Sequence, residues 1–319
     1  GTSACDGVGH NIEPDTRFPR GRYDADATAD SVTAGMDLSG KTALVTGCNS
    51  GLGLESMRVL AARGAHVIGT GRTLEKARDA CASVTGQTTP LALELSDFQS
   101  AVDCAESVKA MLTPLDIIIA NAGISGYREL KVVDGIEQTF RINYLGHFVL
   151  VNNLLPVVAA APAGRIVHVG SAAAYLRAPD GGIDFGSLRG EKSYSRMEKY
   201  GQSKLANILF SLHLSSILEG SAATSNAIHP GVVHTNIARS YPGWFQAVFD
   251  TVGPLFMKTP AEGAATQVYV ATHPDVAGIS GAYCENCNPV IVAGDSHLHD
   301  QQLAEKLWQV SLQMTDGFV

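Results

Sequence analysis

The sequence is short of charge, of cysteine and of long apolar runs, and each shortage argues against a class of protein. Charged residues make up 17% of the 319 residues and the net charge is −8, so a broad basic surface for nucleic acid or an anionic membrane is not expected. Six irregularly spaced cysteines are too few for a disulfide scaffold in a chain of this length. No uninterrupted apolar stretch reaches the ~20 residues of a membrane span, and no secretory signal is visible. These absences predict a soluble, cytoplasmic protein with neither a membrane nor a nucleic-acid partner.

The cysteines and histidines also lack a metal-binding pattern. Cys284 and Cys287 form the one C-x-x-C of the chain, whereas a zinc ribbon needs a second such pair. His297 and His299 are close in sequence but have no evident third ligand. The favoured interpretations are an unpaired structural cysteine and a surface turn, so no metal is predicted.

Apolar residues and glycine, by contrast, are plentiful. Hydrophobic residues make up 45% of the chain, which supports a sizeable core, and glycine accounts for 33 residues. An excess of glycine without a collagen period indicates many tight turns or a backbone that approaches a ligand closely. Residues 1–37 differ from the rest: seven acidic side chains, three arginines and few large apolar residues predict a flexible or surface-hugging arm, with a short helix at 28–34.

From residue 41 onward, short apolar runs alternate with segments of helical periodicity. The predicted strands span 42–46, 65–69, 91–95, 116–120, 165–169, 225–228 and 282–284. The predicted helices span 54–63, 99–111, 136–159, 197–218, 261–271 and 300–313. Because the strands are apolar on both faces, the pattern predicts an α/β fold: a single Rossmann-type, doubly wound parallel sheet of about seven strands with helices on both faces.

A glycine-rich turn, residues 46–53, separates the first predicted strand from the first helix. At this carboxyl end of a strand, a helix N-terminus offers free N–H groups to a pyrophosphate, and glycines let the backbone come close. The spacing G-x3-G-x-G is neither G-x-G-x-x-G nor a P-loop, and a tight turn without a ligand has a similar sequence. Its position in the alternating pattern favours dinucleotide binding, with contacts predicted from Gly47, Asn49, Ser50, Gly51, Leu52 and Gly53.

The end of the second strand indicates which dinucleotide is bound. An acidic residue there accepts from the ribose 2′-hydroxyl, whereas an arginine accommodates a 2′-phosphate. The chain has Arg72 and no carboxylate at this point, and a guanidinium can pair with a phosphate and stack on adenine. NADP(H) is therefore favoured over NAD(H), with a solvated loop arginine as the alternative interpretation.

Tyr200 and Lys204 are four residues apart in a predicted helix and therefore share one face. A neighbouring ammonium favours the ionised phenol, which suits a general acid/base. Tyr127 and Lys131 have the same spacing, so the spacing alone is weak evidence. Tyr127 falls in a predicted loop, however, whereas Tyr200 opens a helix just after a strand that ends near Ser171, beside the predicted ligand crevice.

Together these motifs resemble the short-chain dehydrogenase/reductase family, and within it the branch related to retinol dehydrogenases. The matching segments are the glycine-rich turn, Asn-Ala-Gly at 121–123, Arg-Ile-Asn-Tyr-Leu-Gly-His-Phe at 141–148, Ser171, residues 200–210 and His-Pro-Gly at 229–231 with its continuation to 235. The ordered set is specific, although each segment alone is not. The membrane-bound retinol enzymes carry an apolar N-terminal anchor where this chain has an acidic arm, so retinoid chemistry is not implied.

The resemblance implies a role for each matching residue. Tyr200 exchanges the proton with the substrate oxygen, while Lys204 activates the phenol and holds the ribose hydroxyls. Ser171 bonds the substrate oxygen, and Asn143 maintains a helix kink and a water in the proton relay. Further cofactor contacts are implied for Glu94, Leu95, Asn121, Ala122, Gly123, Pro230, Gly231, Val233 and Thr235. Glu94 departs from the family's usual aspartate but can accept the same bond from the adenine amine.

The chain divides accordingly. Residues 38–289 form the dinucleotide-binding catalytic domain, with 232–260 covering the substrate, and residues 290–319 form a helical tail. The covering segment contains Trp244, Phe245, Phe249, Leu255, Phe256 and Met257, which either pack on the body or form an apolar lid over the nicotinamide. Either arrangement favours a small apolar alcohol or ketone as substrate over a sugar phosphate.

The expected function is an oxidoreductase that transfers a hydride between NADP(H) and the alcohol or carbonyl group of such a molecule. The alternatives are a double-bond reductase or epimerase on the same scaffold, and a non-catalytic NADP(H)-binding sensor or scaffold protein. The presence of Asn143, Ser171, Tyr200 and Lys204 argues against the non-catalytic protein. A homodimer is left open.

Overall fold

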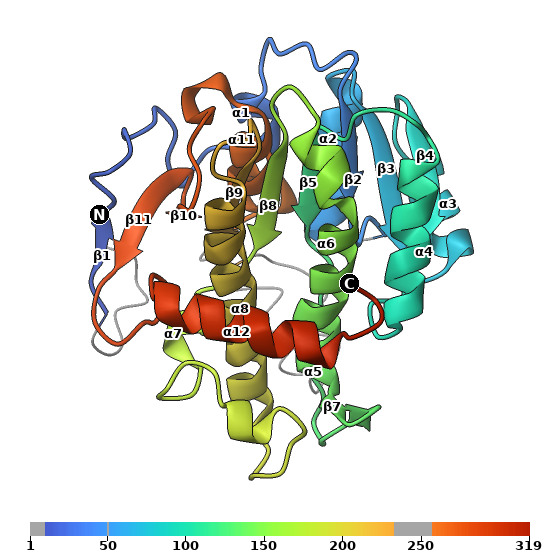
Figure 1. Cartoon of the computed structure of the whole chain (residues 1–319). Helices are drawn as coiled ribbons and strands as arrows, with labels where there is room; N and C mark the ends of the chain where they lie inside the picture. The colour runs from blue at the N-terminus through green and yellow to red at the C-terminus, as the bar shows by residue number, and fades with distance from the viewer. Residues whose placement is uncertain (1–9, 50, 233–256) are drawn as a thin grey trace, which may run out of the picture.

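A nine-stranded sheet forms the centre of the protein in the computed structural model, which describes residues 10–49, 51–232 and 257–319 (Figure 1). Its strand order is β1-β11-β10-β9-β8-β5-β2-β3-β4. The strands are β1 (Ile12–Pro14), β2 (Thr42–Val45), β3 (His66–Gly71), β4 (Thr88–Ala92), β5 (Ile117–Ala120), β8 (Arg165–Val169), β9 (Thr224–His229), β10 (Tyr283–Glu285) and β11 (Asn288–Val292). A separate hairpin pairs β6 (Val132–Val133) with β7 (Ile136–Glu137).

Seven neighbouring strands of the sheet, from β10 to β4, run parallel, as the alternating sequence pattern predicts. From β2 the chain builds outward through β3 and β4 on one side and through β5, β8, β9 and β10 on the other. The strand order therefore reverses between β2 and β5, and the carboxyl ends of these strands form the crevice where open α/β sheets bind ligands. The predicted doubly wound fold is confirmed.

The strand predicted at 91–95 is displaced in the structure. β4 instead pairs with β3 from Thr88 opposite Val67 to Ala92 opposite Gly71. Pro90 lies inside β4 and has no N–H to donate, which argues against a strand when the sequence is considered alone. Because β4 is at the edge of the sheet, the missing donor is tolerated. Leu93 still donates its N–H to the carbonyl of Gly71 at 2.8 Å, and the chain then continues as a loop at the carboxyl edge of the sheet.

Two antiparallel strands, β11 and β1, extend the sheet beyond the predicted seven. β11 turns back from β10 through Asn286 and Cys287, whose φ angles are 48° and 64°, as a two-residue hairpin turn requires. β1 comes from the N-terminal arm and pairs with β11, with Ile12 opposite Val292. The arm also contains the helix α1 (Ala29–Val32), inside the predicted 28–34, and α1 contacts α11. The described part of the arm therefore lies on the body of the protein.

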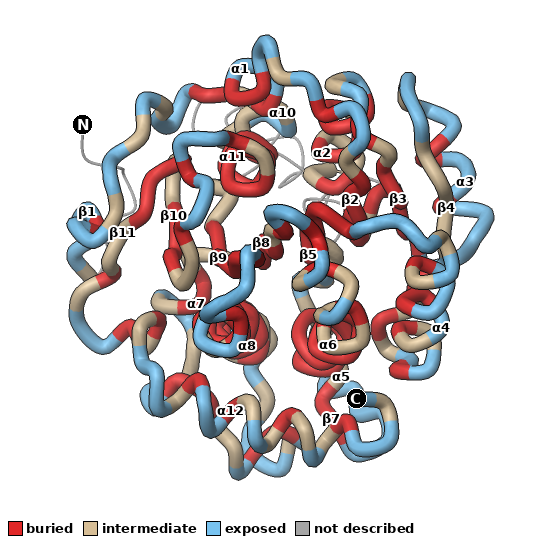
Figure 2. The backbone as a smooth tube through the Cα atoms, turned by 45° about the horizontal axis from the view of Figure 1, so that its top comes forward, coloured by how far each residue is buried: buried red, intermediate tan, exposed pale blue. Residues whose placement is uncertain are grey.

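Helices cover both faces of the sheet (Figure 2). One face carries α4 (Phe98–Lys109), α6 (Gly146–Ala159) and α8 (Arg196–Ile217), and the other carries α2 (Gly51–Ala62), α3 (Leu74–Ala82) and α11 (Ala265–Thr272). Successive residues of β2 point to opposite faces of the sheet. Leu44 packs in the core with α4, α6 and α8, and Val45 packs in the core with α2, α3 and α11. The shorter helices are α5 (Gln138–Phe140), η1 (Arg141–Leu145), α7 (Ala173–Leu176), η2 (Phe185–Ser187), α10 (Pro260–Gly263) and η4 (Pro274–Val276).

The C-terminal helix α12 (Gln301–Met314) forms a further layer outside α8. Leu307 is fully buried, and the ring centre of Trp308 lies 5.1 Å from that of Phe148 and 4.8 Å from that of His213. The helix predicted at 300–313 is confirmed, and its apolar face covers aromatic side chains of α6 and α8.

The helix α3 was missing from the prediction, although the sequence contains a signal for it. Thr73 accepts a hydrogen bond from the N–H of Lys76, which is an N-cap, and Ala77 and Ala80 face the core. The helix begins close against its strand, because a Cβ on Gly71 would lie 2.9 Å from the nitrogen of Ala77. The helix was not predicted because it is short and most of its residues are polar, so its few apolar residues show no clear helical period.

The long helix predicted at 136–159 is divided into β7, α5, the π-helix η1 and α6. The carboxylate of Glu137 accepts hydrogen bonds from the N–H groups of Thr139 and Phe140, so the helix begins there and not at Ile136. The stretch Gln138–Ala159 is long and apolar enough to cross a membrane, whereas no such segment was expected from the sequence. Its polar residues interrupt the apolar run but leave its mean hydropathy high. Most of it is buried in the protein, as a core helix is, so it is weak evidence for a membrane span.

Candidate functional site

Most of the predicted site residues converge on one edge of the sheet. The glycine-rich turn follows β2, Asn121 follows β5, Ser171 follows β8 and Pro230 follows β9. These strands are consecutive neighbours, in the order β9-β8-β5-β2, and all four run parallel. Four segments that are far apart in the sequence therefore meet at the carboxyl edge, on both sides of the point where the strand order reverses.

The glycine-rich turn requires glycine at two positions for steric reasons. A Cβ on Gly53 would lie 2.0 Å from the carbonyl oxygen of Gly47, and a Cβ on Gly47 would lie 2.9 Å from Cα of Ala122. Gly47 and Gly51 have φ of +70° and +57°, and a Cβ on Gly51 would meet no atom within 4 Å. The turn thus packs tightly against the loop after β5 and opens at the N-terminus of α2. Asn49 is exposed and Leu52 half-buried, while Ser50 lies outside the described residues.

Thr46 connects this turn to the predicted Asn-Ala-Gly loop. Its hydroxyl oxygen accepts hydrogen bonds from the N–H groups of Asn121 (2.9 Å) and Ala122 (3.0 Å), and lies 2.8 Å from Nε2 of His147. Two accepted bonds occupy both lone pairs, so the hydroxyl donates to His147. The side chain of Asn121 in turn donates to the carbonyl oxygen of Thr46 at 3.1 Å.

His147 continues this hydrogen-bond chain into the helix that carries Asn143. Because Nε2 accepts from Thr46, the proton of the neutral ring is on Nδ1, which lies 3.4 Å from the carbonyl oxygen of Asn143. Burial is the main cause that lowers the pKa of His147 to about 4; the bond to Asn143 opposes this shift and the charge of Lys204 adds to it. A neutral histidine therefore joins the glycine-rich turn to the π-helix.

Asn143 lies in the π-helix η1, which agrees with the helix irregularity that the resemblance implies. Its side chain is fully buried, accepts from the N–H of Ile124 (2.8 Å) and donates to the carbonyl of Ile124 (2.9 Å) and to Ser203 Oγ (3.1 Å). A Cβ on Gly123 would lie 3.1 Å from Oδ1 of Asn143 and 3.6 Å from Nζ of Lys204. Gly123 thus lets the loop after β5 pass close to both side chains.

Tyr200, Lys204 and Ser171 are grouped beside the end of β8. The helix predicted at 197–218 is confirmed as α8 within one residue, and Lys204 Nζ lies 5.8 Å from the centre of the Tyr200 ring. Lys204 is buried, and its Nζ donates to the carbonyl of Val169 at 3.2 Å. Ser171 Oγ accepts from the N–H of Ala173 at 3.1 Å.

The second tyrosine–lysine pair lies elsewhere. Lys131 Nζ is 4.2 Å from the centre of the Tyr127 ring, but both residues lie in a segment without helix or strand. The prediction that Tyr127 lies in a loop and Tyr200 in a helix is confirmed. A phenol, an ammonium and a hydroxyl at one strand end are the groups that a proton transfer to a carbonyl oxygen needs.

Arg72 and Glu94, predicted for the adenosine end, contact each other. Nε of Arg72 donates to Oε2 of Glu94 at 2.9 Å, and Arg72 remains largely exposed. Burial raises the pKa of Glu94, but hydrogen bonds from Ser96 and Arg72 outweigh it and hold the pKa below its usual value. Leu95 is buried, and a Cβ on Gly146 would lie 2.5 Å from its carbonyl oxygen. The exposed guanidinium and the ionised carboxylate therefore flank the end of β3.

The turn after β9 brings together Pro230, Gly231 and a residue that was not predicted, Lys258. Gly231 has φ of +87°, and a Cβ there would lie 2.8 Å from Cδ of Lys258. The N–H of Lys258 donates to the carbonyl of Val232 (2.8 Å), and its Nζ donates to Oδ1 of Asn286 (2.8 Å). Outside the described residues lie Val233, Thr235, Trp244, Phe245, Phe249, Leu255 and Phe256, whereas Met257 is described and half-buried.

Thr46, His147 and Lys258 are thus the contributors that the sequence did not identify. The spacing of Asn143 and His147 carried a signal, because residues four apart on a helix share a face. Lys258 gave no local signal, since its contacts are to distant segments. Among the described residues, no group of three or more His, Cys, Asp or Glu side chains could hold a metal ion, and the described cysteines are buried and free.

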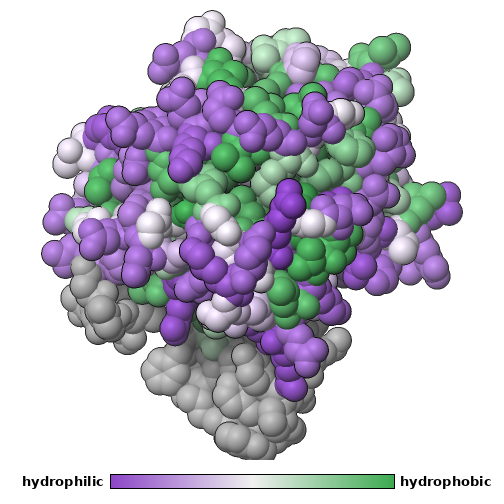
Figure 3. All heavy atoms as spheres, turned by 60° about the horizontal axis from the view of Figure 1, so that its bottom comes forward, coloured by the Kyte–Doolittle hydropathy of each residue, from purple (hydrophilic) through white to green (hydrophobic). Residues whose placement is uncertain are grey.

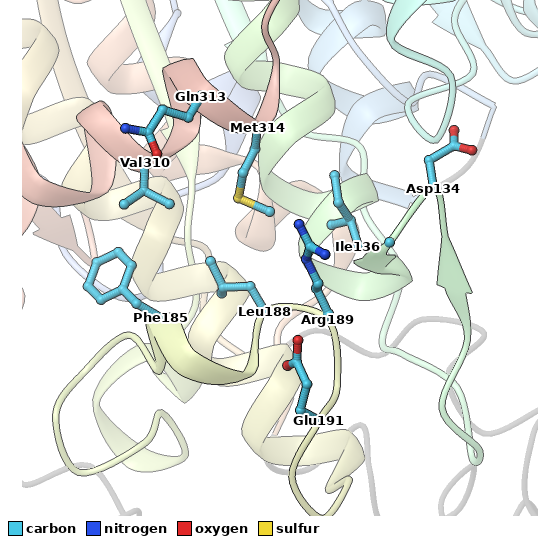
Figure 4. Close-up of a pocket in the computed structure, with 10 residues that line it drawn as sticks. Asp134, Ile136, Phe185, Leu188, Arg189, Glu191, Val310, Gln313 and Met314 are labelled. Carbon is cyan, nitrogen blue, oxygen red and sulfur yellow. The ribbon is translucent and has the colours of Figure 1, made fainter.

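A separate surface pocket of about 370 Å³ lies between the β6–β7 hairpin, the loop after η2 and the end of α12 (Figure 4). Its lining combines apolar side chains with charged ones, including Ile136, Leu188, Met314, Arg189 and Glu191. None of the predicted catalytic or cofactor residues lines it. The pocket is therefore distinct from the site at the carboxyl edge.

Comparisons with known proteins agree with this arrangement. Residues 41–183 match the family model of short chain dehydrogenases. The short-chain dehydrogenase TIC 32 B, chloroplastic, of Brassica napus is 37% identical over 307 residues, which cover 92% of this chain and 95% of the relative. Human retinol dehydrogenase 14 is 35% identical over 294 residues, covering 86% of each chain. A crystal structure of an uncharacterized Mycobacterium paratuberculosis protein has a TM-score of 0.70 and 29% identity, covering 89% of this chain and 96% of that one.

Proposed function

Because the chain belongs to the short-chain dehydrogenase/reductase family, in the branch related to retinol dehydrogenases, we propose that it transfers a hydride between NADP(H) and the alcohol or carbonyl group of an apolar small molecule. Family membership makes it an NAD(P)-dependent oxidoreductase. The finer statements, namely the choice of NADP(H), the apolar substrate and the role of Tyr200, are our proposal. The observation that carries it is the grouping of Tyr200, Lys204 and Ser171 at the carboxyl end of β8.

The dinucleotide fits the residues at this edge. The turn after β2 has glycines at the positions where a Cβ would collide with backbone, and the side of Gly51 is open. The 12-residue helix α2 starts there, and the N–H groups of its first turn have no partner within the helix. The bound nicotinamide supplies or accepts the hydride. Gly47–Gly53 and Asn121–Gly123 hold the dinucleotide in this proposal, with Pro230 and Gly231 at the nicotinamide end.

The chain's own groups handle the proton. Tyr200 donates its phenolic proton to the carbonyl oxygen during reduction and removes the proton from the hydroxyl during oxidation. The ammonium of Lys204 stabilises the phenolate that remains, and its burial among described residues without an ion pair makes its charge effective. The Ser171 hydroxyl orients the substrate oxygen. Asn143 fixes the loop that passes between it and Lys204 through two hydrogen bonds to the backbone of Ile124, and a third bond ties Asn143 to Ser203 on α8.

Exposed apolar side chains near these residues support an apolar substrate. Leu176 follows Ser171 by five residues, Met197 precedes Tyr200 by one helical turn and Val232 follows Gly231, and all three are exposed. In the space-filling view, hydrophobic side chains interrupt an otherwise hydrophilic surface on the side of the molecule shown (Figure 3). We therefore propose an aliphatic, aromatic or terpenoid alcohol or ketone.

Arg72→Gln is expected to weaken NADPH binding by about 10- to 100-fold and to leave NADH binding within about twofold. The ion pair of Arg72 with Glu94 is exposed and contributes about 1 kcal/mol at most, so the guanidinium can exchange it for a 2′-phosphate. Fluorescence titration with each cofactor measures the effect. Arg78→Gln, an exposed arginine on α3, is the control. Equal losses for NADPH and NADH, or no loss, would refute the assignment.

The proposed function is tested with a panel of apolar alcohols and ketones, monitored by nicotinamide absorbance with NADPH or NADP⁺. We expect turnover of at least one compound class, with the corresponding alcohol or ketone as the product. The panel includes an α,β-unsaturated ketone, because formation of its saturated ketone would indicate a double-bond reductase. Tight NADPH binding without turnover of any compound would favour the non-catalytic sensor.

A further inference from the structure

We propose that His229 is a positioning residue that fixes the Ser171 loop by accepting a hydrogen bond from the N–H of Ala172. The inference rests on the proposed function, because it concerns the hydroxyl that orients the substrate oxygen. The resemblance to the family placed His229 in a matching segment and gave it no role.

The position of His229 follows from the register of two parallel strands. Val169 on β8 is opposite Ile228 on β9, and the N–H of Gly170 makes the last ladder bond to the carbonyl of Ile228 at 2.7 Å. His229 is the final residue of β9. Beyond this point the backbones separate, and Nδ1 of His229 accepts from the N–H of Ala172 at 3.1 Å. A side chain thus replaces the next carbonyl of the ladder.

This bond completes a set of contacts around Ser171. The following N–H, that of Ala173, donates to Oγ of Ser171 at 3.1 Å, and the N–H of Ala174 donates to the carbonyl of Ser171 at 3.0 Å. The two local bonds shape the turn, but both remain within the segment 171–174. The bond to His229 ties that turn to the neighbouring strand. Without it, the turn and the Ser171 hydroxyl are free to shift relative to β9.

The bond determines the state of the imidazole. Ala172 supplies the N–H, so Nδ1 must be unprotonated, and the neutral ring carries its proton on Nε2. An imidazolium has a proton on both nitrogens and cannot accept. The bond to Ala172 therefore exists in the neutral ring and is lost when the ring is protonated.

The surroundings favour the neutral ring. Burial, together with the charges of Lys258 and Lys204, lowers the pKa of His229 to about 4. Lys204 comes from α8 and Lys258 from the segment before α10. The residue opposite His229 on β10 is Glu285, whose Oε2 accepts from the hydroxyls of Tyr175 (3.0 Å) and Tyr283 (2.8 Å). The carboxylate of Glu285 thus accepts hydrogen bonds from two phenols, and the charges that lower the pKa of His229 are those of Lys258 and Lys204.

Three variants test the proposal with the carbonyl compound that the wild-type enzyme turns over. His229→Leu keeps a similar volume without an acceptor and is expected to lower kcat by about 10- to 100-fold at neutral pH, with the NADPH Kd within about threefold. His229→Asn places an amide oxygen near the position of Nδ1 and is expected to restore kcat to within about threefold of wild type. His66→Asn, at the opposite end of the sheet, is the control.

The pH profile separates positioning from simple packing. Wild-type kcat is expected to fall more steeply on the acid side than that of His229→Asn, because His229 is protonated near pH 4 to 5 and an amide does not titrate there, while His147 titrates in both proteins. Wild-type kcat in His229→Leu, or an unchanged acid limb in His229→Asn, overturns the proposal.

A measurement without turnover keeps this test independent of the proposed function. Long-range ¹H–¹⁵N spectra identify the tautomer of His229, with its signals assigned by their loss in His229→Asn. We expect the Nε2-protonated ring from pH 8 to about 5. An Nδ1-protonated ring, or titration near the ordinary histidine value of about 6.5, would overturn the inference even if no substrate were found. A wild-type protein that turns over nothing contradicts the proposed function alone.

Discussion

Tyr200→Phe is expected to reduce turnover by about 10²- to 10⁴-fold, the usual contribution of a positioned general acid/base, while NADPH binding stays within about threefold. The substitution removes one hydroxyl from a half-buried side chain and leaves the ring beside Lys204 in place. The loss therefore appears in kcat, since the missing proton donor acts on the substrate oxygen and the glycine-rich turn is untouched. Steady-state kinetics and a fluorescence titration with NADPH measure the two effects separately.

The chain contains a matched control for this prediction. Tyr127 also has a lysine four residues later and a cation near its ring, but it lies in a segment without regular structure. Tyr127→Phe is expected to leave kcat within about twofold of wild type. If Tyr200→Phe retained turnover within tenfold, or if the Tyr127 variant lost as much, Tyr200 would not be the proton donor.

The second large effect expected is a loss of stability in mild acid, to which two fully buried histidines contribute. Burial lowers the pKa of His147 to about 4 and that of His168 to about 3, with smaller contributions from Lys204 on the first and from His147 on the second. In the unfolded chain both titrate near 6.5. As the pH falls from 6.5, the unfolded state binds protons that the folded state excludes, so the free energy of unfolding falls. These two groups contribute about 2 to 3 kcal/mol per pH unit to the slope down to about pH 4, and His229, whose pKa is also lowered to about 4, adds to it.

Urea denaturation at pH 7, 6 and 5 measures this slope. His168 bonds Ser225 Oγ at 3.1 Å through Nε2 and lies against Phe210, so His168→Gln lowers stability at every pH. The informative quantity is the pH dependence, which should decrease by about 1.4 kcal/mol per pH unit in this variant. His297→Gln, at a half-buried histidine, is the control. An unaltered slope in His168→Gln would show that this histidine does not carry the effect.

The parallel core of the sheet could be predicted from the sequence because its strands are short apolar runs bounded by turns. The strand predicted at 165–169 matches β8, and the helix at 197–218 matches α8 within one residue. β1 and β11 could not be predicted in the same way. Their pairing joins residues from opposite ends of the chain, and Ile12–Pro14 is too short to show a period. β4 was displaced because Pro90 is tolerated at an edge, and the sequence does not identify which strand is the edge.

Site residues could be predicted from the sequence where a motif requires one residue type at a fixed spacing. Contacts between segments that are far apart in the sequence could not be predicted in this way. The glycine-rich turn, Lys204 and Ser171 were identified from the order of motifs along the chain, and the structure brings them to one edge. The bond from Thr46 to His147, and the contact of Lys258 with Gly231, connect residues on different elements. No local pattern encodes such contacts. From the sequence, Arg72 and Glu94 were assigned to separate ligand contacts, whereas the ion pair between them is evident only in the structure.

The pairing of β1 with β11 has a consequence for the order in which the protein is completed. During synthesis Ile12–Pro14 is made long before its partner strand Asn288–Val292, which follows every parallel strand of the sheet in the sequence. The contact between α1 and α11 likewise cannot form until α11 has been made. The acidic N-terminal segment therefore cannot take its native place until β11 has been made, and by then all the parallel strands have been synthesised. Because closing so long a loop has a large entropic cost, we expect this pairing to form late in refolding.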